Sequence, residues 1–219
     1  AIVIEAACYL PPVVTNKCEL GYKIHLIISA IIDKKDLNKH VGIYQRDLSS
    51  FDERPLIENT QFEGCVNCHS FNRGNPDDMS LHIRGPHGAT LLRHGGGSFT
   101  AYNTKTDRTL GFCVYPYWHP SGRYVAYSTN ATSQLFHSAG HNRVEVFDTA
   151  SDLQVYDVEK NELLLSPLLK QDSVYETYPV FSADGRSLYF CAANALPEDS
   201  HQIDSIRYNL CRIGFYPDL

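Results

Sequence analysis

The sequence contains none of the features that mark membrane-spanning or nucleic-acid-binding proteins. Its longest apolar stretch, from Ile24 to Ile32, is interrupted by His25 and Ser29. That stretch is far shorter than the ~18 residues that span a bilayer as a helix. The formal net charge is −6 and Lys and Arg form no cluster, whereas a nucleic-acid-binding surface is basic. These absences predict a chain with no transmembrane segment and no nucleic-acid partner.

Sequence motifs of common enzymes are also missing. The chain has no Gly-x-Ser-x-Gly, no His-Glu-x-x-His and no phosphate-binding glycine loop. Gly95-Gly96-Gly97 lacks the strand-then-helix context of such a loop and is expected to be a flexible turn. Carboxylates that are expected in turns, such as Asp77, Asp78 and Asp184, form no recognisable acid/base pair. We therefore expect an electron carrier or a binding protein rather than a hydrolase.

The amino-acid composition of the chain favours β-structure. Hydrophobic residues make up 43% of the 219 residues and charged residues 20%, which is typical of a folded globular chain. There are 14 Tyr and 10 Phe but only one Trp and one Met, and aromatic residues favour strands. The stretch from Tyr22 to Ile32 alternates well enough to be predicted as a buried strand.

The strongest chemical signal is the motif Cys65-Val66-Asn67-Cys68-His69. A Cys-x-x-Cys-His run is the attachment signature of c-type haem. In that chemistry the thiols of Cys65 and Cys68 add across the haem vinyl groups, and His69 is the proximal iron ligand. The motif predicts one covalent haem c.

Three alternatives to haem attachment stay open. A Cys65–Cys68 disulfide or redox pair needs no histidine and favours a βαβ context, which the sequence lacks. A zinc site needs a fourth ligand, usually from a second Cys/His pair, and the chain has no second Cys-x-x-Cys. The motif can also be an accidental match.

The sixth iron position decides what such a haem does. Met79 is the only methionine and one candidate distal ligand, although its place in the repeat described below favours a core role. His82 is a second candidate and is expected to face away from Met79 by strand alternation. Arg84 is a candidate partner for a haem propionate because guanidinium matches a carboxylate; its alternative is a surface charge at a strand end.

The remaining cysteines point to a cellular compartment. Cys8 and Cys18 are candidates for a disulfide in an oxidising compartment. Ala6-Ala7-Cys8 has the small residues of a lipoprotein cleavage site, so a lipid anchor at Cys8 is an alternative, although Glu5 stands where an apolar residue is usual. Three other cysteines lie in apolar stretches and are expected to be buried thiols: Cys113, Cys191 and Cys211.

A repeat organises the chain from residue 41 onward. Trp118–Tyr127 aligns with Phe181–Phe190, and each consists of a turn ending in Gly followed by an alternating strand, which is a hairpin pattern. Phe71 occupies the equivalent place after the haem motif, with Asn75–Asp78 as the expected turn and Met79–Ile83 as the expected strand. The three aromatic anchors are 47 and 63 residues apart. A period of ~50 residues predicts four-stranded propeller blades.

These repeats resemble those of TolB-type (PD40-type) β-propellers, over residues 41–219. A Cys-x-x-Cys-His-Ser-Phe run inside such a repeat is similar to a group of exported Bacteroidetes-type proteins that combine a TolB-like propeller with a c-type haem motif. The resemblance implies an exported protein, in the periplasm or at the cell surface.

The sequence as a whole predicts an all-β fold, a partial β-propeller with a short irregular N-terminal segment over residues 1–40. Residues 41–219 hold about three blades and the start of another, whereas closure takes about four to eight, so we expect further segments in the whole protein. The leading hypothesis is an exported c-type cytochrome-like protein with a redox protein partner. The alternative is a TolB-like scaffold that binds envelope proteins without a functional haem. A weaker option is a peroxidase-like haem enzyme.

Overall fold

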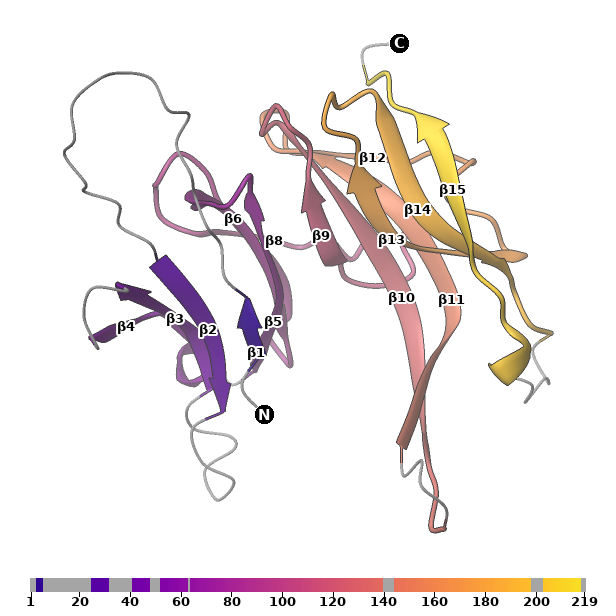
Figure 1. The fold of residues 1–219 in the computed structure, drawn as a ribbon, viewed down its shortest axis with the longest axis horizontal. Helices are drawn as coiled ribbons and strands as arrows, with labels where there is room; N and C mark the ends of the chain where they lie inside the picture. The colour runs from indigo at the N-terminus through magenta and orange to yellow at the C-terminus, as the bar shows by residue number, and fades with distance from the viewer. Residues whose placement is uncertain are drawn as a thin grey trace. The chain divides into compact units, whose positions relative to one another are not determined.

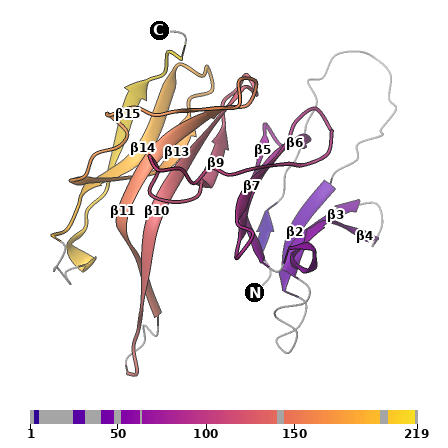
Figure 2. The same ribbon diagram turned by 180° about the vertical axis from the view of Figure 1, so that it is seen from behind.

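The computed structural model describes residues 3–5, 25–31, 41–47, 52–62, 64–139, 144–197 and 203–217. Its regular structure is β-strand apart from two single-turn 3-10 helices, so the all-β prediction is confirmed (Figures 1 and 2). No helical segment in this described part has the length and hydropathy of a membrane span. The chain divides into two compact units, Ala1–Ala101 and Tyr102–Leu219, which are described separately.

The first sheet of the first unit is an antiparallel meander. Its strands are β1 (Val3–Glu5), β2 (His25–Ile31), β3 (Val41–Asp47) and β4 (Glu53–Glu58). The strand expected near residues 22–32 is therefore confirmed as β2. The boundary that the sequence places after residue 40 stays a prediction, but β1 and β2 lie before it and join the same sheet as β3.

The second sheet carries the Cys-x-x-Cys-His motif. It follows the 3-10 helix η1 (Asn59–Gln61) and consists of β5 (Cys65–Asn72), β6 (Asn75–Arg84), β7 (Ala89–Arg93) and β8 (Thr100–Tyr102). The β5–β6 turn is Arg73-Gly74, with φ of 51° and 73°, the geometry of a two-residue type I′ hairpin. The prediction of a turn at Asn75–Asp78 is wrong, because Asn72 pairs with Asn75 and those residues begin β6.

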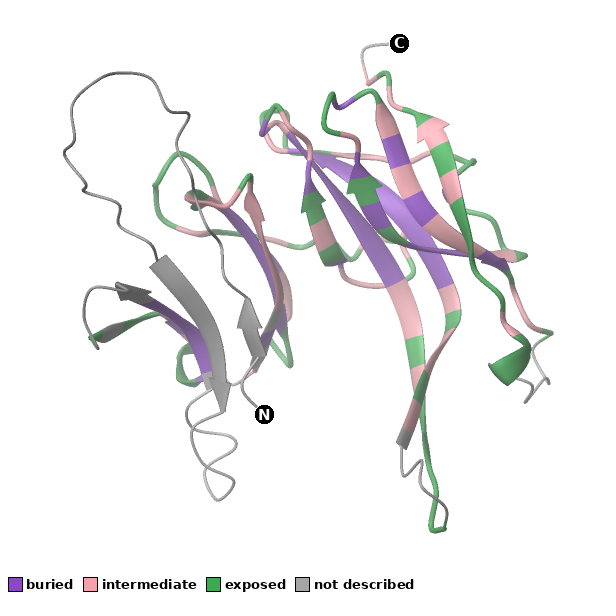
Figure 3. Cartoon of the chain, in the orientation of Figure 1, coloured by how far each residue is buried: buried purple, intermediate pink, exposed green. Residues whose placement is uncertain are grey.

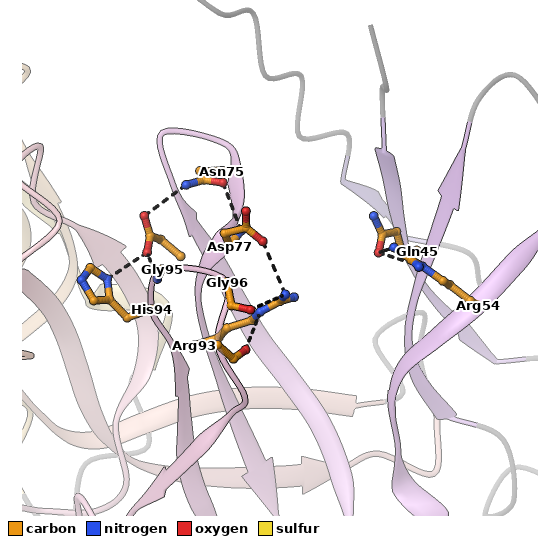
Figure 4. Close-up of polar contacts among 10 residues, drawn as sticks. Gln45, Arg54, Asn75, Asp77, Arg93, His94, Gly95 and Gly96 are labelled. Atoms are coloured by element: carbon orange, nitrogen blue, oxygen red, sulfur yellow. Dashed lines mark hydrogen bonds and ion pairs between the residues drawn. The ribbon is translucent and has the colours of Figure 1, made fainter. Parts of the chain in front are cut away.

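Carboxylates at the start of β6 hold the glycine turn after β7 (Figure 4). Asp78 Oδ1 accepts a hydrogen bond from the Gly95 backbone N–H at 2.9 Å and lies 2.8 Å from His94 Nδ1. Arg93 donates to the carbonyl oxygens of Gly96 and Gly97. The glycine-rich segment is therefore a hydrogen-bonded turn, in which positive φ at Gly95 and Gly96 requires glycine.

Side chains from both sheets form the core of the first unit. Strand alternation places every second residue of β6 in this core, which includes Ile43, Ile57, Val66, Met79, Leu81, Ile83 and Leu91. The single methionine is 0% exposed, in agreement with its alternative interpretation as a core residue.

The second unit contains two further antiparallel sheets. One consists of β9 (Val114–Trp118), β10 (Tyr124–Phe136), β11 (Val144–Asp157) and β12 (Glu162–Leu164). The other consists of β13 (Val174–Phe181), β14 (Ser187–Asn194) and β15 (Asn209–Gly214), with the 3-10 helix η2 (Ile203–Ser205) before β15. The two predicted hairpins are confirmed: Gly122 and Gly185 end their turns with φ of 78° and 71°.

The two sheets pack face to face, with β13 against β10 and β11. Their shared core is apolar and includes Tyr124, Ala126, Leu153, Val155, Leu169, Phe181, Leu188 and Phe190. Figure 3 shows this buried band along β10, β11 and β14. The stacking of antiparallel sheets, each begun by one of the predicted repeats, is the packing of neighbouring propeller blades.

Candidate functional site

The first strands of three sheets share an unusual backbone feature. A non-glycine residue with positive φ stands three positions before the aromatic anchor of each strand. These residues are Cys68 in β5 (φ 53°), Tyr115 in β9 (φ 50°) and Tyr178 in β13 (φ 56°). Each coincides with a shift of register against the neighbouring strand. The repeat therefore carries a β-bulge at a fixed place.

Positive φ at a bulky residue is sterically unfavourable and persists only where the surroundings hold it. At Tyr178 a hydrogen bond stabilises this conformation: the backbone N–H of Tyr178 donates to Ser128 Oγ at 3.0 Å. Ser128 Oγ is also 3.1 Å from Thr177 Oγ1, and both residues are fully buried. Strained backbone clusters at functional sites, and here it recurs at the same position of each repeat. The bulges are therefore candidate functional features.

In β5 the bulge carries the haem motif. Cys68 and His69 occupy the two positions that are Tyr-Pro in β9 and β13. Both are half-buried, and the His69 ring packs edge-on against Phe71 at 5.7 Å between ring centroids. β5 is the edge strand of its sheet, and no other strand of that sheet within the described residues pairs with its outer side.

The candidate propionate partner lies on β6, the strand that pairs with β5. Cys65 pairs with Arg84 in the β5–β6 register, so the candidate propionate partner is directly opposite the first cysteine of the motif. The Cys65 side chain lies outside the described residues. Arg84 is exposed at the end of β6, where its charge remains accessible.

The two candidate distal iron ligands, His82 and Met79, are both buried. His82 pairs with Asn67 and, by strand alternation, is on the opposite face from Met79. His82 is 3% exposed, and burial, with the nearby charge of Arg84, lowers its pKa to about 4. Met79 would have to leave the core in order to reach an iron. Cys68 and His69 are half-buried, but the Nε2 atom of His69 is itself buried, so the imidazole would have to turn in order to reach an iron. Met79 and His82 do not fit a distal position in this arrangement.

The cysteines outside the motif are expected from the sequence to be buried thiols or a disulfide pair. Among the described residues, no three His, Cys, Asp or Glu side chains lie close enough together to hold a metal ion. Cys113 is a buried free thiol, as predicted; burial raises its pKa to about 12. Cys191 and Cys211 are free but only half-buried. Cys8 and Cys18 lie outside the described residues.

In the second unit the bulges present aromatic side chains to solvent. Tyr115 and Tyr178 are 40% and 50% exposed, and their rings lie 4.8 Å apart between centroids. Two positions further along each strand, Tyr117 and Val180 are also exposed. We call these four residues the first-strand patch. Each patch residue is followed or preceded by a buried or half-buried one, as Figure 3 shows for β9 and β13.

A polar network joins β10 and β11 to β13 at Thr177, the neighbour of Tyr178 in the first-strand patch. Asn130 Nδ2 donates to Asp148 Oδ2 at 2.6 Å and is 3.4 Å from Thr177 Oγ1. Thr132 donates to the other Asp148 oxygen at 2.9 Å. The network connects β10, β11 and β13 next to Tyr178. The sequence predicts the Tyr-Pro segments only as parts of the repeat and does not predict this site, because the site joins the β10–β11 hairpin to β13, which lies further along the chain.

Comparison with known proteins agrees with the fold. No protein-family model and no curated protein matches the sequence. A solved TolB-type protein from Agrobacterium tumefaciens is similar, with a TM-score of 0.51 and 13% identity over 86% of this chain and 54% of its own. The tricorn protease (TM-score 0.48, 15% identity, 85% and 16% coverage) and TolB from Acinetobacter baumannii (0.33, 9%, 79% and 49%) are more distant.

At 13% identity the first likeness concerns the fold alone. It confirms the predicted TolB-like propeller architecture. The chain spans about half the length of that TolB-type protein.

Proposed function

We propose that the protein is a TolB-like scaffold that binds another protein in the bacterial envelope. The observation that carries the proposal is the first-strand patch. Aromatic groups that are exposed together typically mark binding surfaces, and tyrosine is enriched where proteins meet. The strained bulges fix these side chains in place before binding, which lowers the entropic cost of association. The resemblance to TolB-type propellers supports a periplasmic or cell-surface location.

Site-specific photo-crosslinking in the native host tests this proposal. A photoreactive residue at Tyr117 or Val180 is expected to give one discrete crosslinked product, identified by mass spectrometry as an envelope protein. The matched control is Leu168, which is 64% exposed but outside the patch and should give no such product. Crosslinking of equal yield and identity from Leu168, or none from the patch, would contradict the scaffold role. Cys65→Ala should leave the product unchanged.

A second candidate function is that of a haem-bearing electron carrier. It is supported by the Cys65-x-x-Cys68-His69 motif, which lies on an edge strand with Arg84 opposite Cys65. Cys65 and Cys68 would hold the haem, His69 would supply the proximal nitrogen and Arg84 would pair with a propionate. A bound haem would provide one-electron chemistry. A redox protein would then be the partner.

Covalent haem attachment has a direct test. Protein produced with a functioning haem-attachment system is expected to show a mass gain of one haem and a pyridine haemochrome spectrum. Replacing both Cys65 and Cys68 by Ala should remove both thioether bonds, so that any bound haem is lost on acid–acetone extraction. Cys191→Ala, which changes a half-buried free thiol elsewhere, should not. A wild-type protein without haem under these conditions eliminates this candidate.

A further inference from the structure

We propose that Asp148, together with the tyrosines beside it, recognises an arginine side chain of the bound partner. This inference rests on the proposed scaffold function and specifies the chemistry of its partner. The site combines the polar network of Asn130 and Thr132 with the exposed rings of Tyr178 and Tyr115.

Asp148 supplies a fixed negative charge. Its two carboxylate oxygens accept hydrogen bonds from Asn130 and Thr132 at 2.6 and 2.9 Å, which orient the group. Within the described part of the chain no Lys, Arg or His forms an ion pair with it; the pairs formed there by other carboxylates involve Asp77, Asp78, Asp157, Glu145 and Glu159. A carboxylate has about four acceptor positions, so Asp148 keeps capacity for an incoming donor.

Aromatic faces lie beside this charge. Asn130 connects Asp148 to Thr177, whose neighbour Tyr178 contacts the Tyr115 ring in a tilted arrangement at 4.8 Å between centroids. Tyr208 is 44% exposed, and burial, followed by the charge of Asp148 and the nearby Tyr178, raises its pKa to about 12. That coupling places Tyr208 in the electrostatic field of Asp148. Tyr208 therefore stays neutral at physiological pH, and the three tyrosine rings offer π-faces to a cation.

A guanidinium group matches this combination better than other ligands. It donates two parallel hydrogen bonds to a carboxylate, and its plane stacks on aromatic rings. An ammonium group lacks the planar fork, and a neutral amide lacks the charge that Asp148 would compensate. The formal net charge of −6 also favours association with a basic partner.

A ligand titration with the full chain tests the inference. The probes are Nα-acetyl-arginine amide, its neutral isostere Nα-acetyl-citrulline amide, and Nα-acetyl-lysine amide, each followed by chemical-shift changes. The arginine probe is expected to bind at least about tenfold more tightly than citrulline, because it adds a charge-assisted bidentate contact. Asp148→Asn and Tyr178→Leu should each weaken it, whereas Glu162→Gln and Tyr216→Leu, which alter an exposed carboxylate and an exposed tyrosine elsewhere, should not.

The outcomes separate this inference from the proposed function. Equal binding of arginine and citrulline, equal binding of arginine and lysine, or arginine binding unchanged by Asp148→Asn overturns the arginine site even where crosslinking from Tyr117 persists. Arginine-selective binding without any crosslinked partner supports the site and contradicts the scaffold role. Unchanged circular dichroism and Trp118 fluorescence establish that each variant is folded.

Discussion

Replacing Glu176 by glutamine is expected to stabilise the second unit at pH 8 and to destabilise or leave it unchanged at pH 5. Glu176 is 0% exposed. Its Oε1 accepts a hydrogen bond from Gln171 at 3.2 Å, and among the described residues its Oε2 has no partner. Burial, and then the charge of Asp152, raises the pKa of this carboxyl from its ordinary value of 4.5 to about 7. Ionisation is therefore opposed in the folded state.

The direction of this pH dependence of stability follows from proton linkage. The folded state binds the Glu176 proton more tightly than the unfolded state, so the stability that this group contributes is fully present below about pH 4.5 and is lost as pH rises to about 7. A shift of this size corresponds to about 3 kcal/mol lost above pH 7. The charge of Asp152 opposes the ionisation of Glu176. The ionisation of Asp152 is itself opposed by Asp172 and favoured by Lys170.

Glutamine removes the charge but leaves one buried N–H₂ poorly satisfied, which costs roughly 1–2 kcal/mol. The net gain at pH 8 is then about 1–2 kcal/mol. Urea unfolding followed by Trp118 fluorescence, at pH 5, 6, 7 and 8, measures the effect in the second unit. Glu162→Gln on the exposed end of β12 is the control and should keep the wild-type pH dependence. A Glu176→Gln variant with the same pH dependence as the wild type would contradict the prediction.

Gly185→Ala is expected to destabilise the second unit by about 3 kcal/mol or more. Gly185 has φ +71°, where an alanine costs ~1–2 kcal/mol. A Cβ there would also lie 2.6 Å from His119 Cε1. The His119 ring cannot move away easily, because it contacts Phe181 and Phe215 at 4.9 and 5.4 Å between centroids. Overpacking of this kind adds a further ~1–3 kcal/mol.

Gly95→Ala is the matched control for that substitution. Gly95 also has positive φ, at +62°, but a Cβ there would have nothing within 4 Å. The Gly95→Ala substitution should therefore lower the free energy of unfolding only by the backbone cost of positive φ in alanine, ~1–2 kcal/mol. Thermal unfolding followed by circular dichroism compares the two variants. Equal losses of stability would show that His119 adjusts without cost and would remove the packing part of the argument.

Local signals explain the parts of the fold that the sequence predicts correctly. The Gly122 and Gly185 turns are predictable because glycine supplies positive φ after a strand that ends in an aromatic anchor. The same reasoning fails at β5–β6. There Asn75–Asp78 has turn-forming residues, but the register shifts after the Phe71–Met79 pair, so that Asn72 pairs with Asn75 and Arg73-Gly74 makes the turn instead. Register depends on which residues enter the core, and that is a long-range property.

The candidate site also has one part that the sequence predicts and one part that it does not. The Cys65-x-x-Cys68-His69 motif is visible in the sequence because its chemistry depends on spacing within five residues. The positive φ of Cys68, Tyr115 and Tyr178 is not visible, since nothing about a cysteine or a tyrosine indicates left-handed backbone. Only the alignment of the three strands shows that the bulge recurs.

The sequence by itself determined the all-β class, the blade repeat and the place of the Cys-x-x-Cys-His motif within that repeat. These depend on alternation, turn residues and short spacing, which are properties of neighbouring residues. Tertiary structure alone decided that Glu176 is buried near Asp152, and that Asn130 joins Asp148 to the strand that carries Tyr178. Those relations join strands far apart in the chain, and they arise when one sheet packs on another and selects the residues that meet.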